Sequence, residues 1–352
     1  MDHATPAAVV PPGKTRRTTG SSTLFWQRAG LRAGLVFGVA AGRPIEAAGQ
    51  RMDLVMSALI RFVRKLPQGG AGPGTPGSGG LQAFRAQYEA APGLMGLHPD
   101  PEVTPQPVPG LPGALEYAYG SPQGTLLYLH GGGFIMGSPA THDALCRRLA
   151  RLGGVRVVNA PYRLAPEHQF PAAHDDALAA WSWVRANRPG PHLAGGDSAG
   201  ANLAVGLPGA ALTLLLYPVV DMVDAGEQGE AHYPSIGLFG EGFLLTARGM
   251  EDCARMLIPD GTDRADPRLS PIRGDLARAA PSLVVAAGFD PLRDQGRAWV
   301  SALQQTARPA WLLEEDGLVH GFADFAGVVP AARRAVERAA GELRTRVAEL
   351  AG

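Results

Sequence analysis

The apolar positions of this chain fall into short runs that alternate with longer stretches of helical character. Six runs have the length of buried strands: residues 125–129, 155–158, 192–194, 212–217, 282–287 and 310–313. The last stretch is expected to be a helix from about Pro330, with an apolar stripe of Val336, Ala340, Leu343, Val347 and Leu350. Strands that alternate with helices predict an α/β fold, with a mostly parallel central sheet and helices on both faces.

The first 80 residues lack this alternation and divide into three parts. Residues 1–22 are rich in Pro, Thr, Ser, Gly and basic residues, which predicts a disordered tail. Residues 23–66 are expected to form helices, because four apolar positions share one helical face: Met52, Val55, Leu59 and Phe62. The Gly/Pro/Ser-rich residues 67–80 predict a flexible linker, so the α/β domain is expected to span residues 81–352.

Composition narrows the classes of protein that fit this pattern. The chain has 352 residues, enough to bury a large core, and it balances 32 basic against 32 acidic residues. This balance gives no support for nucleic-acid binding or for an acidic tail. The two cysteines, Cys146 and Cys253, make neither a disulfide framework nor a metal cluster, and we expect two free thiols.

Nothing in the sequence predicts stable insertion into a membrane. No run of 18 or more apolar residues occurs, and the apolar residues 31–41 are interrupted by Arg32. Neither a twin-arginine pattern nor a small-residue cleavage site accompanies that stretch. We therefore expect a cytoplasmic protein, although the basic and apolar N-terminus leaves export open.

A Gly-x-Ser-x-Gly sequence follows the predicted strand at residues 192–194, with Gly196 and Gly200 on either side of Ser198. A serine hydroxyl is a poor nucleophile at neutral pH and needs a base to take its proton. In a nucleophile elbow the serine sits on a strained strand-to-helix turn, where small neighbours let other segments approach. The N–H of Ala199 would then lie unpaired at a helix start, which favours negative charge. Ser198 is therefore the candidate nucleophile.

Three successive glycines follow His130 at the end of the strand at residues 125–129. Gly131, Gly132 and Gly133 could point backbone N–H groups into a site without obstruction from a Cβ atom. Such donors, with the N–H of Ala199, would form an oxyanion hole. An ordinary glycine-rich turn is the alternative, and no phosphate-loop spacing follows. We expect His130 to orient the loop.

Asp290 and His320 are the candidate acid and base. Asp290 follows the strand at residues 282–287 and precedes Pro291, which fixes the turn, and His320 follows the next predicted strand. The carboxyl ends of parallel strands meet at one edge of a sheet, where Ser198 is also expected. The chain order Ser, Asp, His is that of α/β-hydrolases. Five competitors stay open, three of them bases and two acids: His168, His174, His192, Asp294 and Asp316.

These motifs together resemble those of the bacterial hormone-sensitive-lipase-like esterases, a GDSAG-type family of the α/β-hydrolase superfamily. The resemblance covers roughly residues 85–350 and rests on six segments: YLHGGGF (128–134), YRLAPEH (162–168), GDSAG (196–200), SP (270–271), GFDPLRD (288–294) and HGF (320–322).

The resemblance implies a triad of Ser198, His320 and Asp290. It also implies that the backbone N–H groups of Gly132, Gly133 and Ala199 are the main oxyanion donors. Gly131 is expected to contribute as a further donor. A helical cap is implied as well, built from the N-terminal helices and an insertion at about residues 221–262. The substrates of this family are usually esters of short to medium acyl chains, and no cofactor is needed.

The chain departs from the family where it follows the nucleophile. Residues 206–209, with the sequence GLPG, end the helix after Ser198 within about two turns, and residues 188–191 before the elbow are also abbreviated. A short helix gives the elbow less bracing.

Several other activities use the same chemistry. A lipase, lactonase, amidase or deacetylase would need the same triad, and a non-catalytic receptor on the hydrolase fold is a further alternative. No metal-ligand spacing such as His-Glu-x-x-His occurs. A homodimer, paired through an exposed edge strand or the C-terminal helix, stays open.

Overall fold

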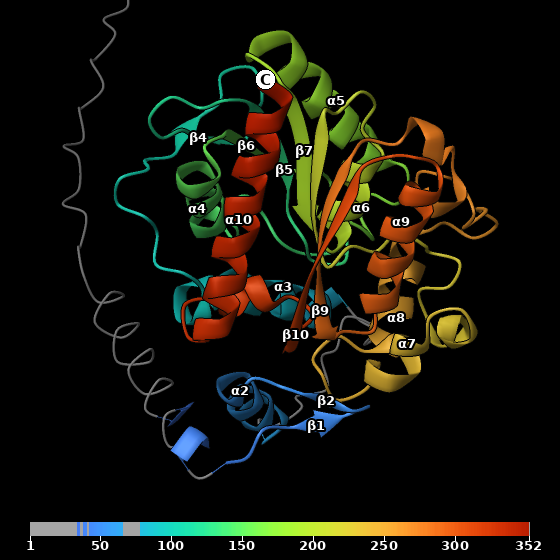
Figure 1. The fold of residues 1–352 in the computed structure, drawn as a ribbon. Helices are drawn as coiled ribbons and strands as arrows, with labels where there is room; N and C mark the ends of the chain where they lie inside the picture. The colour runs from blue at the N-terminus through green and yellow to red at the C-terminus, as the bar shows by residue number, and fades with distance from the viewer. Residues whose placement is uncertain (1–33, 36–37, 41, 66–77, 352) are drawn as a thin grey trace, which may run out of the picture.

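The computed structural model describes residues 34–35, 38–40, 42–65 and 78–351. An eight-stranded sheet runs through its centre in the order β10-β9-β8-β7-β5-β6-β4-β3 (Figure 1). The strands from β10 to β6 pair in parallel, whereas β4 and β3 are antiparallel additions at one edge. The strands are β3 (Gln106–Pro107), β4 (Leu115–Tyr117), β5 (Thr125–Leu129), β6 (Arg156–Ala160), β7 (His192–Asp197), β8 (Leu212–Leu216), β9 (Ser282–Phe289) and β10 (Ala310–Val319).

This architecture confirms the predicted α/β fold, and each predicted strand is present. β7, β9 and β10 run further than the apolar pattern indicated. The pattern did not predict β3 and β4, which are only 2 and 3 residues long and mix polar with apolar positions.

Alternate residues of the central strands bury themselves under helices on opposite faces. Leu126 and Tyr128 of β5 join a core with the helices α4 (Asp143–Gly153) and α10 (Pro330–Ala351). Leu127 and Leu129 join the second core, under α5 (Ala172–Asn187), α6 (Ala199–Val205) and α9 (Arg293–Gln305). Every residue of β5 is buried, as expected for a strand covered on both faces.

Two predicted apolar stripes are buried at most of their positions and end on exposed residues. On α10 the first four stripe residues are buried, but Leu350 in the last turn is 43% exposed. On α2 (Leu54–Lys65), Leu59 is buried and Phe62 is 44% exposed.

The N-terminal part of the chain differs from the prediction in two places. A hairpin of β1 (Glu46–Ala47) and β2 (Gln50–Arg51) precedes α2; its turn residues Ala48 and Gly49 both have positive φ, as a type I′ turn requires. The helix α3 (Ser78–Met95) begins inside the predicted linker, because packing of Leu81 against the core stabilises its first turns. The predicted tail at residues 1–22, and residues 67–77 of the linker, lie outside the described residues.

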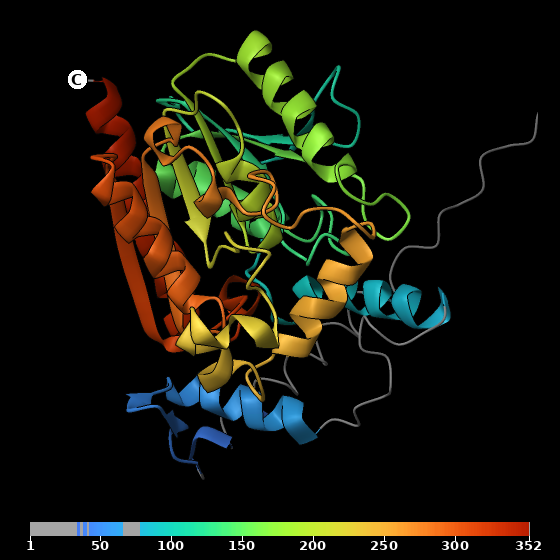
Figure 2. The same cartoon turned by 90° about the vertical axis from the view of Figure 1, so that its right-hand side faces the viewer.

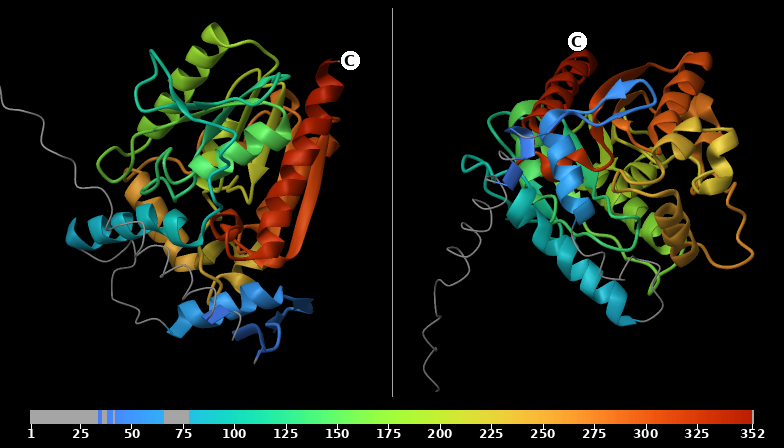
Figure 3. Two further views of the ribbon diagram at one scale, coloured as in Figure 1. Left: turned by 90° about the vertical axis from the view of Figure 1, so that its left-hand side faces the viewer. Right: turned by 90° about the horizontal axis from the view of Figure 1, so that it is seen from below.

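Four helices gather at the end of the sheet where the parallel strands finish (Figures 2 and 3). They are α2, α3, α7 (Pro234–Phe239) and α8 (Ala247–Leu257). Arg64 of α2 donates to the Gly242 carbonyl, 2.9 Å from Nε, and so ties the N-terminal helix to the segment between α7 and α8. Two remote parts of the sequence therefore cover the same strand ends. Of the described helices, none combines the length and apolar character needed to cross a membrane.

Candidate active site

Ser198 lies on a sharp turn between β7 and α6, with φ 51° and ψ −116°. Positive φ is uncommon for a residue with a Cβ atom and costs about 1–3 kcal/mol. A Cβ at Gly196 would lie 2.4 Å from the Leu129 carbonyl oxygen, and a Cβ at Gly200 would lie 1.9 Å from it. The two motif glycines therefore let the turn pack closely against the end of β5. This packing places Ser198 at the carboxyl ends of the strands.

His320 joins Ser198 to Asp290 by two short contacts. Its Nε2 lies 2.9 Å from the Ser198 hydroxyl, and its Nδ1 lies 2.8 Å from Asp290 Oδ2. Asp290 is fully buried, and its other oxygen accepts the Leu292 N–H at 2.7 Å. The carboxylate is thus held from one side by the backbone and directed at the imidazole from the other.

Aromatic side chains support the histidine. The Tyr217 ring packs edge-on against the His320 ring, with centroids 4.9 Å apart, and Phe322 packs edge-on against Tyr217 at 5.1 Å. Tyr217 and Phe322 are almost fully buried, so they restrict the rotamers open to His320. This role of Tyr217 was not predicted, because in the sequence it is an ordinary aromatic residue at the end of a strand.

The competing histidines and acids lie elsewhere or have other partners. His168 and Asp316 are exposed. His174 and His192 lie 3.0 and 2.9 Å from the carbonyl oxygens of Arg268 and Arg188. Asp294 accepts the Ser235 N–H and pairs with two arginines. The structure therefore brings together Ser198, His320 and Asp290 and leaves their competitors apart.

The glycine loop offers backbone donors beside Ser198. Gly132 and Gly133 have φ 117° and 60°, which glycine adopts without strain, and added Cβ atoms would lie 2.2 Å from Met136 O and 2.8 Å from Cys253 Sγ. Among the described residues, the N–H groups of Gly132, Gly133 and Ala199 have no hydrogen-bond partner. Unpaired donors at a helix start and in a glycine turn suit an anion.

Gly131 differs from its neighbours, and its place in the predicted oxyanion hole is a correction. Its N–H donates to Asp197 Oδ1 at 2.9 Å, so that donor is already engaged. A Cβ at Gly131 would meet Asp197 Oδ2 at 2.2 Å. The Gly131 N–H therefore anchors the glycine loop to Asp197. No role was predicted for Asp197, although its place within the motif, directly before Ser198, was a usable signal.

His130 orients the same loop, as the sequence analysis expected. Its Nδ1 lies 2.8 Å from the Gly131 carbonyl, and its own carbonyl accepts the Tyr162 hydroxyl at 2.7 Å. The two rings stack with centroids 4.3 Å apart. Burial, reinforced by the positive charge of nearby His142, lowers the pKa of His130 to about 4. The imidazole is therefore neutral near pH 7.

Acid should destabilise the fold partly through His130. A histidine whose pKa falls from 6.5 to about 4 on folding contributes stability that is present above pH 6.5 and lost as the pH falls toward 4. His130→Asn removes this titration. We expect the wild type to lose about 2–3 kcal/mol more than the variant between pH 7 and 4.5. Urea unfolding at both pH values measures the difference; equal losses would contradict it.

The described residues include no cluster of three or more His, Cys, Asp or Glu side chains able to hold a metal ion. Both cysteines are free, Cys146 buried and Cys253 partly buried on α8. What the site does contain is a hydroxyl, an imidazole and a buried carboxylate in line, beside unpaired N–H donors. This arrangement can perform acyl transfer.

Known proteins share this fold and these sequences. Residues 126–324 match the family model described as alpha/beta hydrolase fold. The chain is 36% identical over 311 residues to the carboxylic ester hydrolase LipN of Mycobacterium tuberculosis, covering 81% of this chain and 80% of that protein. It is 37% identical to the ethyl acetate hydrolase of Pseudomonas putida, over 64% of this chain and 71% of that one.

Solved structures of ester hydrolases have the same fold as this chain. The esterase of Pyrobaculum calidifontis superposes with a TM-score of 0.69 at 31% identity, covering 82% of this chain and 97% of the esterase. An ester hydrolase from the metagenome of Lake Arreo gives a TM-score of 0.71 at 30% identity, covering 82% and 96%.

Proposed function

This chain is a carboxylic ester hydrolase that belongs to the α/β-hydrolase fold family, and from that premise we propose that Ser198 is its nucleophile, with His320 as base and Asp290 as orienting carboxylate. The observation that carries the proposal is the unbroken path from Asp290 Oδ2 through the imidazole to Ser198 Oγ, with contacts of 2.8 and 2.9 Å. A serine so placed can lose its proton as it attacks.

Acylation uses each part of the site in turn. Ser198 Oγ attacks the ester carbonyl carbon while its proton passes to Nε2 of His320. The carbonyl oxygen gains the negative charge and receives hydrogen bonds from the oxyanion donors, which we assign to the N–H groups of Gly132, Gly133 and Ala199. Asp290 stabilises the imidazolium without taking its proton.

Collapse of this intermediate breaks the ester bond. His320 returns the proton to the leaving alcohol oxygen, and an acyl group stays on Ser198. Water then attacks the acyl-enzyme, with His320 as base again, and the second collapse releases the carboxylic acid and restores the serine. Every proton in this cycle moves between substrate, water, Ser198 and His320, so the proposal needs no cofactor.

Labelling tests the nucleophile. A fluorophosphonate probe should attach covalently to Ser198 of the wild type, and mass spectrometry of the digested protein locates it. Ser198→Ala should give no adduct, and His320→Ala should label far more slowly because the hydroxyl loses its base. A non-catalytic receptor on the same fold predicts no adduct on the wild type, and labelling of another serine would overturn the assignment of Ser198.

For the substrate, we propose small esters with short to medium acyl chains. The support is a cap formed by α2, α7 and α8 over the strand ends, where Cys253 of α8 approaches Gly133. Such a cap limits the space beside the oxyanion donors.

We expect kcat/KM for p-nitrophenyl esters to peak between acetate and octanoate and to fall for palmitate. A series of these esters under one set of conditions measures this. A maximum at palmitate would favour the lipase alternative instead, and preference for a lactone or an acetylated sugar over every simple ester would favour a lactonase or deacetylase.

We further propose that the chain forms a homodimer, supported by β10, which lies at one edge of the sheet. Light scattering that gives the mass of one chain would overturn this.

A cytoplasmic location is proposed from the sequence pattern alone, and cell fractionation tests it.

A further inference from the structure

A cluster of buried polar side chains lies beneath the oxyanion loop. At its centre is Asp197, the last residue of β7, which is 3% exposed. Its Oδ1 accepts the Tyr128 hydroxyl at 2.8 Å and the Gly131 N–H at 2.9 Å. Nε2 of His142 lies 3.1 Å from the same oxygen, and His142 is 2% exposed. Three groups from different elements therefore converge on one carboxylate oxygen.

The surroundings of His142 favour a proton on both of its ring nitrogens. Thr141 Oγ1 lies 2.7 Å from the Ser138 carbonyl, to which it donates, and 2.8 Å from His142 Nδ1. In this arrangement Nδ1 donates to Oγ1, and an imidazolium also places its positive charge 3.1 Å from the Asp197 carboxylate. In a neutral ring the same hydroxyl would donate to Nδ1 instead, so the negative charge of Asp197 decides between the two forms.

Charge balance favours the imidazolium form of His142. A buried carboxylate is costly unless an opposite charge compensates it. His130 is neutral, so among the charged side chains around Asp197 the cation is His142. Burial opposes the charge of His142, but Asp197 outweighs burial and raises the pKa of His142 to about 9. In return His142 holds the pKa of Asp197 below its usual value, against the effect of burial.

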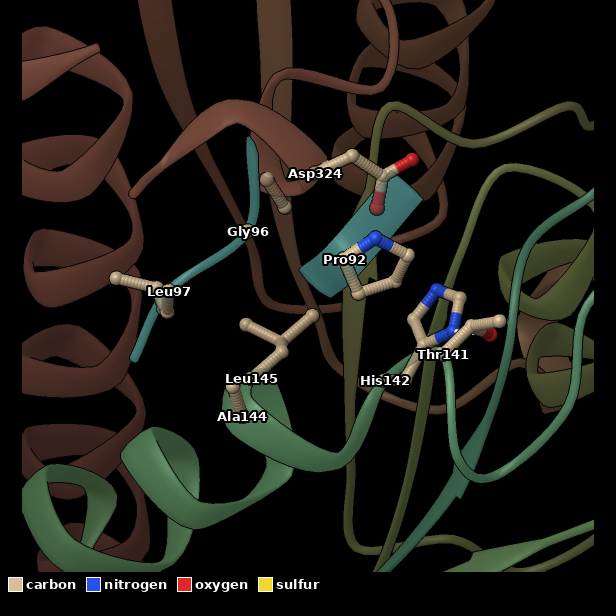
Figure 4. A pocket seen from close by; sticks show the side chains of 9 residues that line it. Pro92, Gly96, Leu97, Thr141, His142, Ala144, Leu145 and Asp324 are labelled. Atoms are coloured by element: carbon tan, nitrogen blue, oxygen red, sulfur yellow. Dashed lines mark hydrogen bonds between the residues drawn. The ribbon is translucent and has the colours of Figure 1, made fainter. Parts of the chain in front are cut away.

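A second carboxylate, that of Asp324, lies near His142. His142 and Asp324 both line a small cavity of about 20 Å³, together with Pro92 and Thr141 (Figure 4). Tyr88 of α3 donates to Asp324 Oδ2 at 3.3 Å. Burial, countered in part by His142, raises the pKa of Asp324 to about 6. His142 is thus close to two acids: Asp197, next to Ser198 in the chain, and Asp324, four residues after His320.

We propose that His142 is a positioning residue for the oxyanion loop: its imidazolium holds the Asp197 carboxylate against the Gly131 N–H, and so orients the donors of Gly132 and Gly133. The inference rests on the proposed acyl-transfer function. Among the described residues, the hydrogen-bond and ion-pair partners of His142 include neither the triad nor the oxyanion donors. Its effect passes through Asp197, whose Oδ2 occupies the space where a Cβ of Gly131 would lie. A shift of that carboxylate must therefore move the loop.

The variant His142→Gln tests this, because glutamine keeps an N–H donor but lacks the charge. We expect kcat to fall about 10–100-fold, less than the loss of a whole oxyanion donor, while KM stays within twofold. Affinity for a trifluoromethyl ketone, which forms an oxyanion on the enzyme, should fall by the same factor as kcat. His192→Gln, at the opposite end of β7, is the matched control and should match the wild type in all three quantities.

The double variant Asp197→Asn/His142→Gln separates charge from packing. It removes both charges, so we expect it to recover stability lost in His142→Gln and to have a higher kcat than that single variant. If His142→Gln does not fold, the double variant should still fold; its failure to fold would overturn the proposal. Wild-type kcat and inhibitor affinity in His142→Gln would also overturn it.

The protonation state of His142 in the wild type keeps this proposal distinct from the esterase assignment. In ¹⁵N-histidine-labelled protein at pH 7, both nitrogens of His142 should give imidazolium signals, identified by their loss in His142→Gln. A neutral His142 overturns the present inference even if the enzyme hydrolyses esters. Absence of fluorophosphonate labelling at Ser198 overturns the proposed function, whatever the charge of His142.

Discussion

Ser198→Ala should lower kcat for p-nitrophenyl butyrate by about 10⁵–10⁶-fold, the scale of loss when a serine triad loses its nucleophile. The reason is that no other group in the described site can form the acyl-enzyme. The change removes one hydroxyl at a partly buried position, so the fold should survive, with the melting temperature shifted by no more than a few degrees.

The control for this experiment is Ser182→Ala, which removes an exposed hydroxyl that donates to the Leu178 carbonyl within α5. It should leave kcat unchanged. Activity of Ser198→Ala within tenfold of the wild type would refute the assignment, provided that the preparation carries no contaminating esterase, which the fluorophosphonate probe would reveal.

Gly200→Ala should destabilise the protein by about 3 kcal/mol or more, a large part of the 5–15 kcal/mol that stabilises a typical domain. The new Cβ would lie 1.9 Å from the Leu129 oxygen and 2.5 Å from the His130 oxygen. Both are backbone atoms at the end of β5, so no side chain can move aside. The start of α6 would have to shift, and Ser198 with it.

Gly206→Ala is the matched control, since it makes the same change at the other end of α6. There φ is −74° and the nearest atom, Leu203 O, would lie 3.6 Å from the Cβ. We expect a neutral effect or a gain of about 0.4–1 kcal/mol through the unfolded state. Urea unfolding of both variants measures the contrast, and equal free energies of unfolding would show that the elbow tolerates a wider helix–strand spacing.

Much of this site could be predicted because its determinants are local. A glycine on each side of Ser198, a proline after Asp290 and a strand before each functional residue are all visible in a linear sequence. The parallel order of strands then predicts that their carboxyl ends meet. Likewise the seven-residue α6 followed directly from the glycines and the proline after it.

Most of what could not be predicted depends on contacts between distant residues. Gly131 and Gly132 look alike in the sequence, yet only Gly131 meets a carboxylate 66 residues away. His142 sits in a polar turn before α4, and its charge comes from neighbours on β7 and after β10. The β1–β2 hairpin was not predicted either, because strands of two residues are too short to show an alternating apolar pattern.

The left-handed backbone of Ser198 has a consequence for how this protein can evolve. A glycine would adopt that conformation with little strain, so the residue at the centre of the elbow is not the one that folding alone would favour. Selection for thermal stability without selection for activity would therefore favour loss of Ser198, which gives a more stable but catalytically inactive protein. Stabilising variants of this enzyme are best sought away from the elbow, with activity screened at every round.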